Sequence, residues 1–445
     1  VDGRVVELGP EGFVSNRPEA LDLVEAVGLS EELVVDGPAP RQTFIARGDR
    51  LLPLPYGVMN PDRTAAADLL RSPLLSVRGR LRLMAEPVVP RRNANPDSDV
   101  DESVAAFVRR RFGDEMLTAL VDPLIGGIHG SSTDELSAEM LVPALRRIEL
   151  DGASVALTAL RRSRRKGRSR RSGGSPADAA ASERTLPPLV SLRRGMGSLT
   201  DAVADHLNGS IRLGVGVTSI EPTPERTGSP PSRWRVTCDD GSVLDADAVI
   251  VATPPAVTAG LLAPLAGATA AEVAAMPWGS STTVSLTWAP GQVNLDMGTG
   301  YLVPVSEGGV VAACTFTTAK WHHRSVDGST MVRCFMRGDG VDPMSDEDLV
   351  RAARDELRRR VGVTAPPAEA SVRRVPVALP VMKVGHRARV QEIHAGLDGL
   401  TGLALAGGGL EGAGLPACIR SGRLAADRAL AALTSESPSV PEPSG

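Results

Sequence analysis

Aromatic residues, lysine and cysteine are all scarce in this sequence. Aromatic side chains make up 3% of its 445 residues, and three of its 49 basic residues are lysine, which leaves 46 arginines. So lopsided a ratio reflects a GC-rich genome rather than a function. The four cysteines are scattered and form no CxxC pair: Cys238, Cys314, Cys334 and Cys418. A metal site or a disulfide framework is therefore not expected, and a reducing, cytoplasmic compartment fits.

Long apolar runs and an excess of positive charge are also missing. The net charge of −4 excludes a polycation for nucleic acid, and no signal-peptide pattern opens the chain. Prolines interrupt the longest uncharged run, 248–271, so we reject it as a membrane-spanning helix. Peripheral contact with a membrane stays open. The 42% hydrophobic content and the length are typical of a soluble protein with two or three domains.

One segment is strongly basic. Residues 161–171 hold eight basic residues in eleven, and a Gly/Ser/Ala tract follows to about residue 184. This composition predicts a solvated surface loop, 161–184, rather than an arm that binds nucleic acid. Attraction to anionic lipid is an intermediate alternative.

The patterns of helix and strand predict a mixed α/β chain. Apolar residues at helical spacing make residues 64–150 helix-rich, and alternating patterns make residues 212–336 rich in strands. Further elements are predicted as follows: a helix at 18–33, a hairpin at 43–53, a helix at 345–361, strands at 248–252 and 403–406, a last helix at 415–433 and a disordered tail at 434–445.

The strongest local signal is the segment Leu405–Ile419. A buried strand enters the glycine-rich run Gly407-Gly408-Gly409-Leu410-Glu411-Gly412-Ala413-Gly414, and a helix follows. Glycine lets the backbone approach a flat or phosphorylated ligand, and a helix N-terminus offers free N–H groups. A pyrophosphate or the electron-rich edge of a reduced flavin suits such a site. A tight turn that packs the helix on the strand is an equally good reading of this segment alone.

Two weaker signals accompany it. Asp247–Pro254 reads as a buried strand that ends in Ala-Thr-Pro, at the edge where doubly wound sheets bind ligands. Read alone, it is better explained as an ordinary core strand. Glu7–Phe13 contains a Gly-Pro-Glu-Gly turn that either faces a ligand or is a simple turn.

Together with other motifs, these segments resemble one family. The other motifs, in chain order, are Asp101-Glu102-Ser103, Phe107–Gly113, Pro123–Gly130, Leu136-Ser137, Leu192–Leu199, Ala378-Leu379-Pro380 and Gly385-His386. In this order they resemble the FAD-dependent porphyrinogen oxidases of the flavin amine oxidase superfamily, which are the protoporphyrinogen oxidases and the bacterial coproporphyrinogen III oxidases. The resemblance spans nearly the whole chain, Val1 to Leu433, and is weakest over 150–185.

The resemblance implies an enzyme of haem biosynthesis. The family binds FAD non-covalently, takes six electrons from a porphyrinogen in three two-electron steps, and passes them to molecular oxygen, which becomes hydrogen peroxide. The cofactor carries the redox chemistry, so no catalytic side chain and no metal is assigned. The implied partners are a porphyrinogen, oxygen, the inner face of a membrane and the next enzyme of the haem pathway.

The resemblance also assigns roles to individual residues. Those implied to contact FAD are Gly9, Pro10, Glu11, Gly12, Val217, Gly407, Gly408, Gly414, Leu415, Pro416 and Ile419. Porphyrinogens carry propionates, and Arg41 resembles the family arginine that lies near one of them; arginine can grip a carboxylate bidentately. His386 is expected to fix the turn after Gly385 rather than to act as a base.

Three departures from the family pattern are visible. The family opens with a strand, a G-x-G-x-x-G turn and an acidic residue, and this chain begins after them, so we expect an FAD domain truncated at its N-terminus. Val375 stands where a tryptophan is expected, and Val381-Met382 replaces an aromatic residue after Pro380. A substrate cavity lined by aliphatic side chains and methionine follows from these replacements.

The expected architecture is a discontinuous, Rossmann-like FAD domain with a β-rich substrate domain and a helical domain. The expected boundaries are 1–20, 186–265 and 396–433 for the FAD domain, 36–58 and 266–395 for the substrate domain, and 59–185 for the helical domain, which in relatives touches membranes.

Alternatives remain at this point. Coproporphyrinogen III is favoured over protoporphyrinogen IX because the arginine-rich composition suggests a high-GC Gram-positive bacterium, and such bacteria commonly use the coproporphyrin route. Another enzyme of the amine oxidase and phytoene desaturase superfamily is disfavoured by Pro123–Gly130 and Leu192–Leu199. A non-catalytic porphyrin-binding protein without stable FAD is the third reading.

Overall fold

The computed structural model describes residues 5–35, 42–55, 68–90, 101–151, 154–155, 157–158, 189–223, 233–325 and 327–434. The predicted basic loop 161–184, the tail after Thr434 and Arg41 lie outside these residues. The chain divides into two compact units. Unit 1 comprises Val1–Ser15, Glu32–Met196 and Trp278–Gly385, and unit 2 comprises Asn16–Glu31, Gly197–Pro277 and His386–Gly445.

A seven-stranded sheet organises unit 1. Its strands lie in the order β14 (Glu369–Pro380), β10 (Trp278–Trp288), β13 (Thr330–Met336), β12 (Val311–Phe316), β11 (Gly300–Leu302), β3 (Thr43–Arg47) and β4 (Arg50–Pro53). Neighbours are antiparallel except β11 and β3. The predicted hairpin at 43–53 is confirmed as β3 and β4, and Gly48 supplies the positive φ of 57° at the turn.

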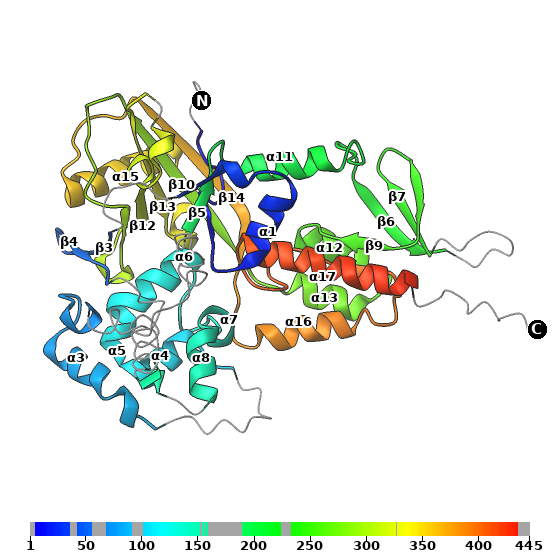
Figure 1. Cartoon of the computed structure of the whole chain (residues 1–445), viewed down its shortest axis with the longest axis horizontal. Helices are drawn as coiled ribbons and strands as arrows, with labels where there is room; N and C mark the ends of the chain where they lie inside the picture. The colour runs from blue at the N-terminus through cyan, green and yellow to red at the C-terminus, as the bar shows by residue number, and fades with distance from the viewer. Residues whose placement is uncertain are drawn as a thin grey trace, which may run out of the picture. The chain divides into compact units, whose positions relative to one another are not determined.

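Helix α15 (Asp346–Val361) packs on this sheet (Figure 1). Ser345 caps its first turn by accepting a hydrogen bond from the Asp348 backbone N–H, and Gly362 ends it in the left-handed region. Acidic residues occupy the first turn and arginines the last, which suits the helix dipole. Leu349 and Leu357 are buried against the sheet, so the predicted helix at 345–361 is confirmed.

The rest of unit 1 is mostly helical, as the pattern over 64–150 predicts. Its helices are α3 (Val77–Met84), α4 (Val104–Phe112), α5 (Asp114–Met116), the π-helix η3 (Leu117–Gly126), α6 (Gly127–His129), α7 (Ala138–Leu141) and α8 (Pro143–Leu150). Pro123 lies inside η3 and has no N–H to donate to an α-helical ladder. Phe107, Leu120 and Leu136 are fully buried in the core of these helices.

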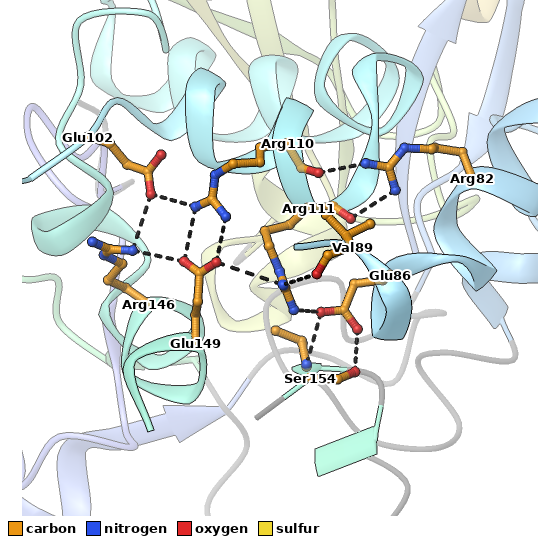
Figure 2. Close-up of polar contacts among 10 residues, drawn as sticks. Arg82, Glu86, Val89, Glu102, Arg110, Arg111, Arg146, Glu149 and Ser154 are labelled. Carbon is orange, nitrogen blue, oxygen red and sulfur yellow. Dashed lines mark hydrogen bonds and ion pairs between the residues drawn. The ribbon is translucent and has the colours of Figure 1, made fainter. Parts of the chain in front are cut away.

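Among the described residues, three arginines and three glutamates pair with one another in a network between these helices, which we call the closed charge network (Figure 2). Arg110 lies 2.7 Å from Glu102 and 2.6 Å from Glu149, and Arg146 lies 3.2 Å and 2.8 Å from the same two carboxylates. The remaining members, Arg111 and Glu86, pair with each other and are each 1% exposed. In a second contact, the Ser154 hydroxyl donates to Glu86 at 2.5 Å. The network therefore joins α4, α8 and the segment after α3.

A small antiparallel sheet holds the beginning of the chain in unit 1. It consists of β1 (Phe13–Val14), β5 (Leu189–Leu192) and β2 (Leu33–Val35). The predicted helix at 18–33 is shorter in the structure: α1 covers Pro18–Ala26 in unit 2 and ends because Gly28 adopts a φ of 75°.

Unit 2 combines a parallel strand pair with helices and a meander. The helices are α1, α11 (Gly197–His206), α12 (Pro255–Leu262), α13 (Gly267–Ala274), α16 (His386–Ala395) and α17 (Leu415–Thr434). The meander is β6 (Val217–Pro222), β7 (Trp234–Cys238) and β8 (Val243–Ala246), and the parallel pair is β9 (Val249–Val251) with β15 (Leu403–Leu405). Helix α17 packs against α1 and β15 (Figure 1).

The strand predicted at 248–252 is confirmed as β9, but its predicted burial on both faces is wrong. Ile250 is 41% exposed, although Val251 is 4% exposed. Within the described residues β9 and β15 form a two-stranded sheet, so neither side of the pair carries a further strand. A run of apolar residues identifies such a strand without showing how many neighbours cover it.

Candidate functional site

The glycine-rich loop of unit 2 connects β15 directly to α17. The Ala406 N–H donates to the Val251 carbonyl at 3.0 Å, and the Gly407 N–H donates to the buried Ser421 hydroxyl at 3.0 Å. Gly407 and Gly414 have φ values of 137° and 89°, and a Cβ at either would meet no atom within 4 Å. Glycine is therefore needed for backbone conformation, and the space beside both residues stays open for a ligand.

Two side chains of unit 2 hold this loop in place. The ring of His386, which is 3% exposed, lies with its Nε2 2.6 Å from the Gly409 carbonyl, so Nε2 is the donor. Arg420 donates to the Glu411 carbonyl at 2.9 Å and lies 3.2 Å from the Glu411 carboxylate. His386 thus supports the loop, as well as starting α16 after Gly385.

The first turn of α17 follows the loop without interruption. The Gly414 carbonyl accepts from the Cys418 N–H at 3.1 Å, so the helix begins at Leu415. The free N–H groups of a first turn attract an electronegative group. Leu415 and Ile419 are half-buried there, and Val217 at the start of β6 is 39% exposed. Leu415 and Ile419 are exposed enough to contact a flat ring, and the FAD contacts implied for them and for Val217 stay predictions.

The Gly-Pro-Glu-Gly segment, residues 9–12, lies in unit 1. Arg333 donates to the Gly9 carbonyl at 2.6 Å, and the Ser191 hydroxyl donates to the Glu11 carbonyl at 2.6 Å. A Cβ on Gly12 would lie 2.4 Å from the Val190 carbonyl oxygen and 3.1 Å from Trp321, so this glycine is required by close packing. The segment is therefore held rigidly from two sides.

Glu11 and Glu7 are both engaged by side chains of unit 1. The Thr317 hydroxyl donates to Glu11 at 3.2 Å, and Lys320 lies 3.7 Å from the same carboxylate. Glu7 pairs with Arg324 at 2.5 Å. These partners come from the segment after β12, and nothing in the sequence pattern of the first residues predicts them.

The structure brings several of the sequence motifs together inside unit 1. The Met196 N–H, in the 192–199 motif, donates to Glu7 at 2.8 Å. The Gly385 N–H donates to Asp101 at 3.1 Å, which joins the 101–103 motif to the end of the 378–385 region. Val381 and Met382 are 5% and 1% exposed and belong to the core. The 407–419 loop belongs to unit 2 and is described there by itself.

Two other kinds of feature are absent from the described residues. No helix among them is long and apolar enough to cross a bilayer. Nor do the described histidines, cysteines and carboxylates gather into a group of three that could ligate a metal.

The comparisons with known proteins decide the family. The model for flavin containing amine oxidoreductases matches residues 1–430. The chain belongs to this family. It is 34% identical to the coproporphyrinogen III oxidase of Propionibacterium freudenreichii subsp. freudenreichii over 99% of this chain and 84% of the relative. It is 28% identical to the coproporphyrinogen III oxidase of Bacillus subtilis (strain 168) over 98% of this chain and 88% of the relative.

A solved structure agrees. The crystal structure of a candidate protoporphyrinogen oxidase from Exiguobacterium sp. 255-15 superposes with a TM-score of 0.77 at 26% identity, covering 97% of this chain and 89% of that one. The resemblance read from the sequence motifs is therefore confirmed. The α/β fold class, the FAD cofactor and the oxidoreductase class are confirmed with it.

FAD fits the residues that the structure describes. The backbone beside Gly407 and Gly414 is open, and it leads into the N-terminus of a 20-residue helix. In unit 1, buried donors around residues 7–12 lack partners, namely Trp321 Nε1, Arg324 Nη1 and Arg333 Nε. Open backbone and unpartnered buried donors are what a bound polar cofactor would satisfy.

Proposed function

We propose that this chain oxidises coproporphyrinogen III to coproporphyrin III. Six electrons and six protons leave the macrocycle in three steps, and three molecules of oxygen become three of hydrogen peroxide. The observation that carries the proposal is the 34% identity to a coproporphyrinogen III oxidase over 99% of the chain. Protoporphyrinogen IX is the alternative substrate, because the Exiguobacterium structure bears that name.

Bound FAD supplies the electron transfer, and the protein supplies orientation. We propose that the FAD contacts implied by the resemblance are made by Val217, Gly407, Gly408, Gly414, Leu415, Pro416 and Ile419, and by Gly9, Pro10, Glu11 and Gly12. Support comes from the open backbone of the loop and from the rigid hold on the Gly9 and Glu11 carbonyls. His386 keeps the loop in place by its hydrogen bond to Gly409.

The substrate must be held by its carboxylates. We propose that Arg41 grips one propionate of the porphyrinogen, since arginine binds carboxylates bidentately. We also propose the division of labour that the resemblance implies, with a discontinuous FAD domain, a β-rich substrate domain and a helical domain. The product would pass to the next enzyme of the haem pathway.

The test offers both substrates to the purified chain supplied with FAD. Coproporphyrinogen III and protoporphyrinogen IX are supplied at matched concentrations, and porphyrin fluorescence is followed with oxygen uptake. We expect a higher kcat/KM for coproporphyrinogen III and one peroxide per oxygen consumed. Equal kcat/KM values would contradict the proposed preference for coproporphyrinogen III. If neither substrate gave porphyrin fluorescence, the proposal that this chain is a porphyrinogen oxidase would be contradicted.

A non-catalytic porphyrin-binding protein is the second candidate function. Flavin absorbance of the purified chain separates the two candidates. A chain that binds porphyrin, stays colourless when incubated with FAD and oxidises neither substrate would support the second.

We further propose that helix α3 of unit 1 touches an anionic lipid surface at the inner face of a membrane. Three apolar side chains of α3 are exposed, Val77 at 70%, Leu81 at 57% and Met84 at 54%. Val88, in the short 3-10 helix Glu86–Val88 that follows, is 81% exposed. Arg78 lies on α3 and is exposed. Apolar residues with a neighbouring cation are typical of helices that lie in the headgroup region.

Co-sedimentation with vesicles tests this contact. Leu81→Glu should reduce binding to vesicles that contain phosphatidylglycerol. Leu213→Glu is the matched control, since Leu213 is 88% exposed in unit 2 and should not affect binding. Equal binding by the unaltered chain and L81E would contradict the proposal.

A further inference from the structure

Among the described residues, Glu11 of the Gly-Pro-Glu-Gly segment and four charged residues near it carry unequal numbers of positive and negative charges. We call Glu7, Glu11, Lys320, Arg324 and Arg333 the open charge cluster. Arg324 pairs with Glu7 at 2.5 Å, and Lys320 lies 3.7 Å from Glu11. These two pairs use both carboxylates, so three cations face two anions and one positive charge remains.

The remaining charge belongs to Arg333 on β13. Its side chain donates to the Gly9 carbonyl at 2.6 Å and its guanidinium carbon lies 5.0 Å from the Phe335 ring centre. Arg333 is 5% exposed, its Nε has no partner, and no carboxylate of the described residues lies within 4 Å of it. Burying a cation without an ion-pair partner costs free energy. We therefore expect a further hydrogen-bond acceptor beside Arg333.

Neighbouring groups show the same deficit of acceptors. Arg324 is 3% exposed and its Nη1 lacks a partner, and the fully buried Trp321 has an indole N–H without one. Burial, together with the charges of Arg324 and Arg193, lowers the pKa of His323 to about 4. The histidine therefore stays neutral at pH 7 in a region of positive charge. Burial also lowers the pKa of Arg333, while Glu11 and Glu7 oppose that effect.

We propose that Arg333 is a positioning residue for the flavin. It fixes the Gly9 carbonyl, and its uncompensated charge stabilises the negative charge that two-electron reduction with uptake of one proton places on the isoalloxazine ring. The inference rests on the proposed assignment of residues 9–12 to the flavin. Arg333 should therefore raise the reduction potential of the bound cofactor, which favours removal of electrons from the substrate.

The test compares Arg333→Gln with Arg333→Lys and Arg337→Gln. Glutamine at 333 can still donate to Gly9 without a charge, and lysine keeps the charge. Arg337 is the matched control. It directly follows β13, the strand that contains Arg333, and it too has no carboxylate of the described residues within 4 Å. It donates to the carbonyls of Val303, Pro304 and Val311. Each protein is prepared with FAD, and its two-electron potential, sulfite affinity and thermal melting are measured.

We expect R333Q to bind sulfite about tenfold more weakly and to lower the potential by about 30 mV, the two-electron equivalent of a tenfold change. R333K should keep most of both properties, and R337Q should change only the melting temperature. An unchanged potential in R333Q would overturn the inference. Equal shifts of the potential in R333Q and R337Q would also overturn it. A raised KM for porphyrinogen in R333Q with no change in potential would overturn it too, and would indicate that Arg333 binds a substrate carboxylate.

If R333Q does not fold or does not bind FAD, the potential of R333K becomes the test. A lower potential in R333K than in the unaltered chain would overturn the inference, and an unchanged potential would support it. The unaltered chain separates this inference from the proposed function. If it binds FAD but oxidises neither porphyrinogen, the proposed function fails, while the potential of R333Q still tests the role of Arg333.

Discussion

Two buried charge clusters of unit 1 contain the same types of residue but differ in how their charges are paired. In the closed charge network, three arginines meet three glutamates, and every charge has a partner of opposite sign (Figure 2). In the open charge cluster, three cations meet two carboxylates. Among the described residues, Arg333 donates to the Gly9 carbonyl and lies over the Phe335 ring, and it forms no ion pair within 4 Å. Both contain unpartnered Nε atoms, so isolated orphan atoms do not separate them. The two clusters differ in charge balance. A balanced network holds helices together, whereas an unbalanced one is suited to binding a ligand.

The largest effect is expected in the closed charge network. Arg111→Met removes the arginine that pairs with the Glu86 carboxylate, which is 1% exposed. Breaking a buried pair from one side costs about 3–5 kcal/mol. We expect the free energy of unfolding, measured in urea, to fall by that amount.

A surface pair provides the control for this measurement. Arg109→Met removes the exposed ion pairs to Asp114 and Asp134, and exposed pairs contribute about 1 kcal/mol or less. If R111M and R109M lose equal stability, the closed charge network does not act as a buried unit.

Packing around the open charge cluster gives the second prediction. Gly12→Ala places a methyl group 2.4 Å from the Val190 carbonyl oxygen, so the backbone must move. Overpacking of this kind costs about 1–3 kcal/mol. Gly9→Ala is the matched control, because a Cβ there meets no atom within 4 Å. Urea unfolding should show a loss for G12A and almost none for G9A, and the reverse order would show that residues 9–12 are not packed in this way.

The third prediction increases the charge imbalance of the open charge cluster, whereas R333Q removes it. Glu11→Gln removes one carboxylate and can still accept from Thr317, so the open charge cluster gains a second uncompensated positive charge. If charge sets the flavin potential, E11Q raises it, opposite to R333Q. Glu135→Gln, which removes an exposed partner of Lys383, is the control and should leave the potential unchanged. A potential that falls in E11Q as in R333Q would show that disruption, not charge, is being measured.

The fold was predictable where its signals are local. Helix α15 has its cap, its acidic start and its left-handed glycine within one continuous segment. The glycines that shape the loop from β15 to α17 are likewise close together in the sequence. The family followed from the order of such motifs. A local pattern does not show which elements pack against a strand. For this reason the burial predicted for Ile250 in β9 was wrong.

The open charge cluster was not predictable for a related reason. Glu7 and Arg324 are 317 residues apart in the chain, and Gly9 and Arg333 are 324 apart. With 46 arginines in the sequence, nothing marks Arg333 until the fold shows that it is buried and lacks a carboxylate. His386 is similar, because its acceptor, the Gly409 carbonyl, is a backbone atom that no residue type identifies.

The last prediction concerns the pH dependence of His323, which lies beside the open charge cluster. Burial and the charges of Arg324 and Arg193 lower the pKa of His323 from 6.5 to about 4. Between these values the unfolded chain binds a proton that the folded chain does not, so this histidine makes the free energy of unfolding fall as the pH drops from 6.5 to 4. His323→Gln should flatten that part of the pH profile, and His322→Gln, which alters an exposed neighbour, should not. Arg193→Gln should raise the pKa of His323 in an NMR titration. A His323 resonance that titrates near 6.5 in the unaltered chain would show that the positive charge around residues 7–12 is already neutralised.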